Sequence, residues 1–235
     1  MTSAEPLAPA GLYRLTAWLS PGFPVGGYTY SHGLEYAVEA GLVHDGPSLQ
    51  VWVEAILRHG AGIIDAGLLR ATWQAARSGD DSALADVALR ACAWRATAET
   101  AAESLDQGRA FVIALAAGWP DPCREAALAQ LAAAGIAPAY CVAVGLAAGC
   151  ARIPLDATLR CYLQAFASSL VSAGVRLVPL GQSEGVRLTA SLETAVVATA
   201  SLAQSAALDD LGTSAWMTEW ASMRHEDQYT RLFRS

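Results

Sequence analysis

The chain has 235 residues, of which 54% are apolar and 16% are charged, and its formal net charge is −7 at pH 7. This length and apolar fraction suit one sizeable folded domain and exclude intrinsic disorder, and the acidic balance argues against binding to nucleic acid phosphates. All fifteen basic residues are arginine, which excludes a P-loop lysine and Schiff-base chemistry.

The first residues, "MTSAEPLAPAG", lack the basic and apolar segments of a signal peptide. We therefore predict a disordered lead-in over residues 1–10 and one helical domain over residues 11–235 that includes a partner-docking C-terminal tail. The five cysteines show no C-x-x-C spacing and lie in apolar or alanine-rich surroundings. They predict mostly buried, free thiols and a cytoplasmic protein rather than a disulfide framework. The cysteines are Cys92, Cys123, Cys141, Cys150 and Cys161.

Residues 19–35, "LSPGFPVGGYTYSHGLE", differ from their alanine-rich surroundings because prolines, glycines and aromatic residues are concentrated there. The prolines and glycines predict turns, among which the sequence places Phe23, Tyr28 and Tyr30. Such a segment suits either a preformed recognition loop or an interior structural corner, and the sequence leaves both open.

Ser31, His32 and Glu35 stand together at the end of that segment. A nucleophilic triad is the weakest interpretation, since side chains of adjacent residues point in different directions. We favour a helix start, with Ser31 as the N-cap and Glu35 in the first turn. His32 and Glu35 could also touch a metal transiently, but a stable site needs three or four ligands, so we predict no metal site.

Helical periodicity dominates the rest of the chain. Between residues 155 and 170, for example, six large apolar residues fall on one helical face, and no alternating pattern bounded by hairpin turns occurs. Gly135 and Pro138 divide the charge-free run of residues 126–151, which argues against a membrane span. The sequence predicts an all-α, single-domain bundle of roughly ten helices. Beyond the helix start at Ser31, these span residues 48–58, 62–77, 82–94, 97–117, 124–134, 139–151, 154–177, 184–203 and 213–224.

Three carboxylates, Glu99, Glu103 and Asp106, recur on one face of the predicted helix over residues 97–117. Around a divalent metal they could serve acid–base chemistry, and an all-α metal-dependent enzyme is the alternative function. A solvated face is the more common origin of such a pattern, with Glu103 or Asp106 paired to Arg109. We favour the solvated face and predict no catalytic residue.

The segment "RLVPLGQ" follows the helix predicted over residues 154–177. Arg176 either complements the C-terminal end of that helix before Pro179 or points, with Gln182, from an exposed corner toward a partner. The two interpretations stay open.

The C-terminal segment "MRHEDQYTRLFRS" combines apolar bulk with arginines. Aromatic residues and arginine are favoured at interface hot spots, so we predict docking onto a partner, and docking onto the protein's own core is the alternative. The candidate residues are Arg224, His225, Tyr229, Arg231, Leu232, Phe233 and Arg234.

With four stretches in order, "WLSPGFPVGGYTYSHGLE", "ESLDQGRAF", "SAGVRLVPLGQSEG" and "MRHEDQYTRLFRS", the chain resembles the urease accessory protein F (UreF) family. The resemblance implies an all-helical, non-catalytic protein without a resident cofactor, which acts in nickel loading of urease and handles nickel at most transiently. It also implies a homodimer that binds a D/H-type accessory protein, recruits or regulates a G-type nickel-carrying GTPase and meets the urease apoprotein.

The resemblance further implies that the tail from Tyr229 to Ser235 becomes ordered against the D/H-type protein. Together with the residue patterns, it yields one set of predicted partner-binding residues. They are Tyr28, Tyr30, His32, Glu35, Arg176, Gln182, Arg224, His225, Tyr229, Arg231, Leu232, Phe233 and Arg234.

Overall fold

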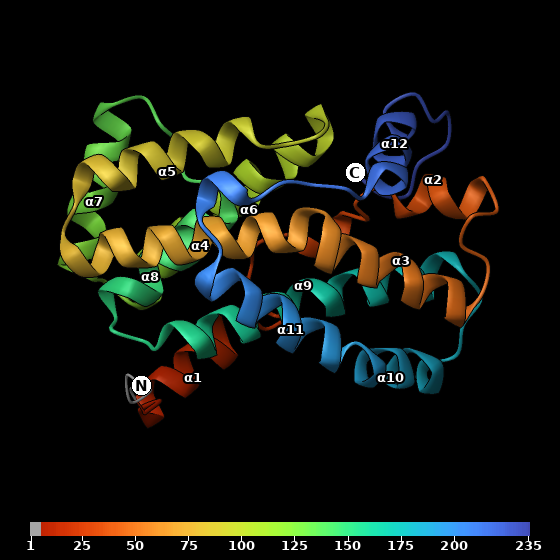
Figure 1. Ribbon diagram of the computed structural model, residues 1–235, viewed down its shortest axis with the longest axis horizontal. Coiled ribbons are helices and arrows are strands. Elements are labelled where there is room, and N and C mark those ends of the chain that lie inside the picture. The colour runs from red at the N-terminus through yellow and green to blue at the C-terminus, as the bar shows by residue number, and fades with distance from the viewer. Residues whose placement is uncertain (1–5) are drawn as a thin grey trace.

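A computed structural model describes residues 6–235, and all regular secondary structure in that range is helical (Figure 1). The predicted all-α, single-domain class is confirmed, with twelve α-helices where roughly ten were expected. They are α1 (Pro9–Trp18), α2 (Leu34–Glu39), α3 (Gly46–His59), α4 (Ala61–Ser78), α5 (Asp81–Ala93), α6 (Ala98–Gly118), α7 (Pro122–Ala133), α8 (Tyr140–Cys150), α9 (Leu155–Leu177), α10 (Gln182–Ser191), α11 (Glu193–Ser205) and α12 (Trp216–His225), with 3₁₀ turns η1 (Gly27–Thr29) and η2 (Leu208–Asp210).

The predicted lead-in over residues 1–10 is only partly open to comparison. Residues 1–5 lie outside the described part of the chain, and α1 begins at Pro9, inside the predicted lead-in. Proline suits the first helical position because its fixed φ is already helical. Leu15 and Trp18 of α1 are buried in the core, so tertiary packing holds a helix that the sequence pattern had not indicated.

Helices α3 and α4 run one after the other across the middle of the molecule, and α8 packs along α4 (Figure 1). Every residue of α8 from Cys141 to Gly149 is buried. At Gly145 a Cβ atom would lie 2.6 Å from the carbonyl oxygen of Leu69, so the backbones of α4 and α8 touch there. Small side chains therefore set the closest helix contact of the core.

A buried ion pair lies in this core, where Arg95, in the link between α5 and α6, meets Asp65 of α4. The Arg95 Nη1 atom lies 2.7 Å from Asp65 Oδ1, and the hydroxyl of Tyr162 donates to Asp65 Oδ2 at 2.8 Å. Burial lowers the pKa of Arg95, but Asp65, Cys141 and Tyr162 together outweigh burial, and the pKa is raised. Burial, with help from Asp65, also holds the pKa of Tyr162 well above its usual value. The cluster joins α4, α9 and the α5–α6 link.

The predicted boundaries of the internal helices hold to within a few residues, with one exception. The helix predicted over residues 184–203 is two helices, α10 and α11, which meet at Leu192. No glycine or proline marks this break. Leu192 is buried, and α10 packs on α9 and α3 while α11 also reaches α4, so the neighbouring helices decide where the chain bends.

The charge-free run of residues 126–151 is divided as predicted, because α7 ends before Gly135, whose φ of +71° places it in the left-handed region. Across residues 6–235, no helix combines the length and the apolar character needed to cross a bilayer.

The cysteine prediction is wrong for one pair. Cys123 of α7 and Cys150 of α8 form a disulfide, although neither spacing nor count suggested it, because only the antiparallel packing of α7 on α8 brings them together. Cys141 is buried as expected, and Cys92 and Cys161 are half-buried.

We predict that Gly145→Ala destabilises the protein by about 1–3 kcal/mol, because the added methyl group has no space against the α4 backbone. The free energy of unfolding in urea checks this. Gly118→Ala at the end of α6 is the matched control, since nothing lies within 4 Å of its Cβ position, and its stability should be equal or higher by about 0.5–1 kcal/mol. Equal stabilities of the two variants would contradict close α4–α8 contact.

Candidate functional site

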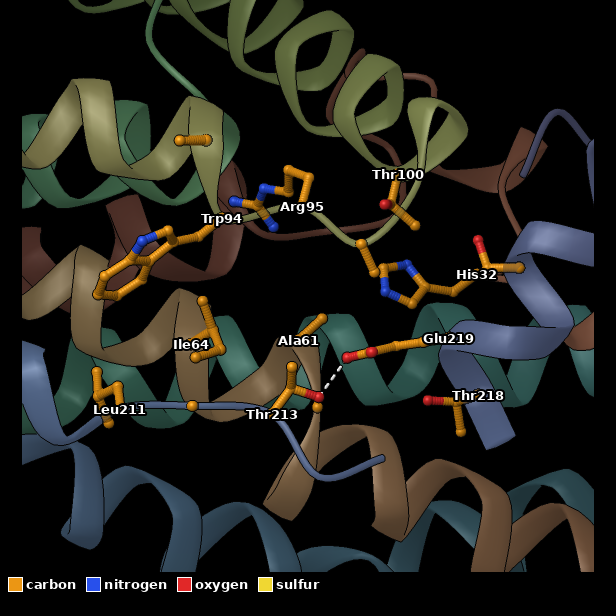
Figure 2. A pocket seen from close by; sticks show the side chains of 15 residues that line it. His32, Ala61, Ile64, Trp94, Arg95, Thr100, Leu211, Thr213, Thr218 and Glu219 are labelled. Carbon is orange, nitrogen blue, oxygen red and sulfur yellow. Dashed lines mark hydrogen bonds between the residues drawn. The ribbon is translucent and has the colours of Figure 1, made fainter. Parts of the chain in front are cut away.

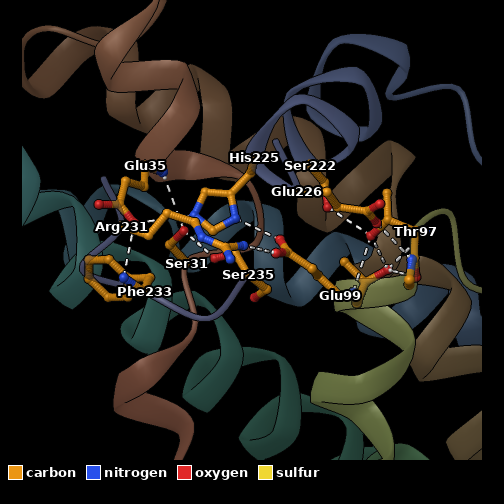
Figure 3. A network of polar contacts seen from close by, with 12 residues as sticks. Ser31, Glu35, Thr97, Glu99, Ser222, His225, Glu226, Arg231, Phe233 and Ser235 are labelled. Atoms are coloured by element: carbon orange, nitrogen blue, oxygen red, sulfur yellow. Dashed lines mark hydrogen bonds and ion pairs between the residues drawn. The ribbon is translucent and has the colours of Figure 1, made fainter. Parts of the chain in front are cut away.

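Four parts of the chain that are far apart in sequence meet at one end of the molecule (Figure 3). They are the loop before α2, the first half of α6, the end of α9, and residues 226–235, which follow α12 and which we call the tail. These are the same four stretches that carry the sequence resemblance. We call the meeting point the tail site; its polar residues are Tyr30, Ser31, His32, Glu35, Glu99, Glu103, Asp106, Arg176, His225, Arg231, Arg234 and Ser235.

Glu35, in the first turn of α2, holds the tail backbone. Its Oε1 accepts from the amide of Leu232 at 2.7 Å, and its Oε2 accepts from the amide of Phe233 at 2.9 Å. The residue is only 6% exposed. Bonds to a charged acceptor contribute about 1.5–3 kcal/mol each, and a buried carboxylate without them would be strongly unfavourable, so Glu35 and the tail stabilise each other.

His225, at the end of α12, lies between two carboxylates (Figure 3). Its Nε2 is 3.2 Å from Glu35 Oε2 and its Nδ1 is 2.6 Å from Glu99 Oε2. Glu99 also pairs with Arg231 of the tail at 2.5 Å. A single chain of contacts therefore joins α2, α12, the tail and α6.

The last residue of the chain is fixed at the loop before α2. The amide of Ser31 donates to the carbonyl oxygen of Ser235 at 2.8 Å, and the Ser31 hydroxyl also donates to that oxygen. The Ser235 hydroxyl donates to Glu103 Oε2 at 2.7 Å, and the amide of Arg234 donates to the carbonyl oxygen of Thr29. These bonds place the tail beside the loop like an added strand of backbone.

Ser31 is not the N-cap that the sequence predicted. Helix α2 begins at Leu34, two residues later than a Ser31 cap would require, with Gly33 at the cap position. Gly33 has a φ of +75°, and a Cβ atom there would lie 2.6 Å from the amide nitrogen of Ser222, so α12 approaches too closely for another residue. Ser31 instead accepts from the amide of Glu35 and anchors Ser235.

Arg176 takes the helix-end role that the sequence left open, and its other contacts are with the protein's own loop and tail. It lies in the last turn of α9, where its Nε donates to the carbonyl oxygen of Ser172. Its Nη2 donates to the carbonyl oxygen of Tyr28 at 2.9 Å, and its guanidinium lies 4.5 Å from the centre of the Phe233 ring. One arginine thus complements its helix end, holds the loop and stacks on the tail.

Tyr30 and Arg234 link the same elements to Asp106 of α6. The Tyr30 hydroxyl donates to Asp106 Oδ2 at 3.4 Å, and Arg234 Nη2 lies 3.5 Å from the same oxygen. Burial raises the pKa of Tyr30; Arg234 opposes the rise, and Asp106 adds to it. The phenol is therefore kept in its neutral, donating form.

These contacts overturn the prediction of a solvated acidic face on α6. The side chains of Glu99 and Glu103 are 13% and 12% exposed, and each of the three carboxylates has a basic or hydroxyl partner from the tail. Only the expected pair of Asp106 with Arg109, at 3.3 Å, is confirmed. The three carboxylates do not converge on a common point, so this face does not form the metal site that the alternative enzyme would need.

His32 lies where two cavities meet. It has a φ of +58°, which is uncommon for a residue other than glycine and marks local strain, and its Nδ1 is 3.3 Å from Glu103 Oε2. One cavity, of about 340 Å³, continues toward Trp94 and Ile64 (Figure 2). The other, of about 420 Å³, runs beneath the loop of residues 19–30.

The charged groups that line these cavities are already paired. Arg95 is bound to Asp65, Glu219 accepts from Thr213 (Figure 2), and His32 faces Glu103. His32 and Glu35 turn to different partners, Glu103 and His225. Within residues 6–235, three potential metal ligands come together only at Asp121, Cys123 and Cys150, outside the tail site.

The predicted partner-binding residues divide into two groups by exposure. Four are buried, which the sequence did not indicate: Tyr30, Glu35, His225 and Phe233. A buried side chain can shape a partner surface only by holding the exposed side chains in place. His32 is intermediate, and eight are exposed: Tyr28, Arg176, Gln182, Arg224, Tyr229, Arg231, Leu232 and Arg234.

Sequence reasoning missed an apolar face on α12. Four large side chains there are exposed beside the tail: Trp216, Met217, Trp220 and Met223. Their spacing places three of them along one side of a helix, and that signal was available in "WMTEWASM". An apolar stripe normally indicates the core-facing side, so its exposure appears only in the folded molecule.

The sequence matches a family model described as UreF over residues 43–193. Proteins named urease accessory protein UreF are similar over nearly the full chain. The protein from Rhodopseudomonas palustris strain BisB18 is 50% identical over 226 residues, which is 96% of this chain and 92% of that protein. The protein from Azorhizobium caulinodans is 47% identical over 235 residues, which is 100% of both.

We predict that Glu35→Gln loosens the tail without unfolding the helical body. The amide group keeps the shape but replaces one acceptor oxygen by a donor that faces a backbone amide. The free energy that holds the tail on Glu35 should fall by about 1.5–3 kcal/mol. Hydrogen exchange of the Leu232 and Phe233 amides should then speed up by roughly tenfold or more, which NMR or mass spectrometry measures. Glu193→Gln, at the exposed start of α11, is the control and should leave both amides protected. Unchanged exchange in Glu35→Gln would show that the tail is held by other contacts.

Proposed function

Because the chain belongs to the UreF family of urease accessory proteins, we propose that it acts as a non-catalytic scaffold in the loading of nickel into urease. In this role it binds a D/H-type accessory protein, recruits or regulates a G-type nickel-carrying GTPase, and brings both to the urease apoprotein. We include a homodimer in the proposal, and light scattering of the isolated chain tests it.

The observation that carries this proposal is an exposed apolar surface on α12 and the tail. On the tail, Tyr229 is fully exposed and Leu232 is 78% exposed, and four large apolar side chains are exposed on α12, the helix that precedes the tail. Exposed apolar groups gathered in one place mark interaction sites. We call this set the α12–tail surface; it consists of Trp216, Met217, Trp220, Met223, Tyr229 and Leu232.

Fixed backbone under the surface supports a binding role. Phe233 is buried beneath Arg176, and Glu35 binds the successive amides of Leu232 and Phe233, so Leu232 is presented outward from an ordered segment. A partner that binds preformed backbone does not have to supply the entropy of ordering it. We therefore propose that the D/H-type protein adds to a tail that is already in place, where the resemblance had implied ordering on binding.

Arginines around the apolar residues add specificity to this surface. Arg224, Arg231 and Arg234 are exposed at its edge, and rim charges guide association and exclude wrong partners more than they add affinity. Tyr28, Arg176 and Gln182 lie exposed on the loop and the α9–α10 corner, and we assign them to a neighbouring contact of the same assembly.

The alternative of a metal-dependent enzyme loses its physical basis at α6. Glu99 is engaged by His225 and Arg231, and Glu103 by His32 and Ser235. Carboxylates held by ion pairs would have to lose those partners before binding a metal, and the tail would be released with them.

We predict that the double variant Tyr229→Ala/Leu232→Ala weakens binding to the D/H-type accessory protein by at least about 2 kcal/mol, or roughly 30-fold, as for hot-spot residues. Both side chains point away from the core, so thermal stability should not change. Calorimetry or biolayer interferometry with the purified partner measures the affinity.

Tyr13→Ala is the matched control, because Tyr13 is an aromatic residue of similar exposure on α1, remote from the tail. It should bind the partner as the unchanged protein does. The point variants test the exposed side chains alone. Deletion of residues from Tyr229 onward would also remove the hydrogen bonds to Glu35 and Glu103. Equal affinity of the double variant and the control would reject the α12–tail surface as the D/H-type contact.

A further inference from the structure

A second group of chemically active side chains lies where α7 begins and α8 ends, at the other end of the molecule from α12 (Figure 1). Asp121, Cys123 and Cys150 have ligand atoms that all lie within 4.8 Å of one another. The two cysteines are 27 residues apart, their Cα atoms are 5.8 Å apart, and their sulfurs are bonded.

We propose that this group, once reduced, is an exchangeable binding site for a divalent ion that prefers thiolates, such as Zn²⁺ or Ni²⁺. The disulfide is its closed form. Two thiolates and one carboxylate form a donor set typical of borderline-soft transition metals and unsuited to Mg²⁺ or Ca²⁺. The proposal concerns the isolated chain and does not depend on the scaffold function.

Opening the site needs a two-electron reductant, and dithiols are the class of molecule that keeps cytosolic thiols reduced. Thiol–disulfide exchange breaks the Cys123–Cys150 bond and forms one disulfide in the reductant, whose two protons and two electrons pass to the cysteines. Metal binding then releases both thiol protons to solvent as the two metal–sulfur bonds form. The same two cysteines therefore cannot be cross-linked and hold the metal at once.

The helix ends prepare these side chains for metal binding. Cys123 is the second residue of α7, and the positive end of a helix favours the thiolate form of a cysteine. Asp121 caps the same helix through Oδ1, which accepts from the amide of Arg124 at 3.2 Å. That bond uses one lone pair of one oxygen, and a carboxylate has two oxygens that can accept, so capping and coordination can coexist.

The surroundings indicate an exchangeable site rather than a structural one. Cys123 is exposed and Asp121 and Cys150 are half-buried, so an ion can enter from solvent. Three protein ligands leave the fourth position of a tetrahedral ion open. Helix α7 buries only Arg124 and Leu131, so it can shift slightly to separate the sulfurs from bonding distance to the ~3.8 Å expected of two thiolates on one Zn²⁺.

The test is a titration of the full chain with Zn²⁺ in competition with a chromogenic chelator, after reduction by a phosphine under argon. The reduced protein should take up one ion per chain, and Co²⁺ in its place should give a thiolate charge-transfer band in the near ultraviolet. The oxidised protein should show neither, without any change of sequence. Absence of binding by the reduced chain, or equal binding by the oxidised chain, overturns the proposal.

Variants assign the ligands. Cys123→Ser and Cys150→Ser should each lower the affinity at least about tenfold and weaken the cobalt band, because one of the two thiolates is lost. Asp121→Asn should also lower the affinity, while asparagine preserves the helix cap. Cys92→Ser and Cys161→Ser are matched controls, since both cysteines are half-buried and outside the group. An unchanged metal affinity in Cys123→Ser, or a loss of metal binding in Cys92→Ser, refutes this site.

Discussion

The arrangement of one whole end of the molecule depends on a single buried carboxylate. Glu35 enters an interior in which few polar groups are available, and a buried charge is tolerated only when its oxygens are bonded. The amides of Leu232 and Phe233 and the ring of His225 meet that requirement. Satisfying Glu35 therefore brings the tail, α12 and α2 together, and the ion pairs with α6 follow from that placement.

The alanine-rich core explains why charge gathers at this end. Helix α8 has no charged side chain, and its glycines let α4 approach to backbone contact. Helices packed this closely leave little room for polar side chains between them, apart from the Asp65–Arg95–Tyr162 cluster. A second group of charged side chains gathers at the tail site, where the loop before α2 and the tail meet α6.

This division suits a protein that works by contact. The body is closely packed where α8 meets the backbone of α4, while the α12–tail surface is apolar, exposed and supported from beneath by bonded backbone. At the opposite end, α7 is lightly buried and carries the reactive cysteine pair. The two ends can therefore respond to different molecules, one to a protein and the other to reductant and metal, without repacking the core.

The sequence by itself determined the helical class, most helix boundaries and the four segments that matter, because helical periodicity and turn residues are local properties. It could not determine that Glu99 and Glu103 face the tail, that Ser31 binds Ser235, or that Cys123 meets Cys150. Each of these contacts joins residues separated by 27 or more positions. Such pairings are decided by how the helices pack. The local sequence around a carboxylate or a cysteine is the same whether that side chain faces solvent or a residue from a distant part of the chain.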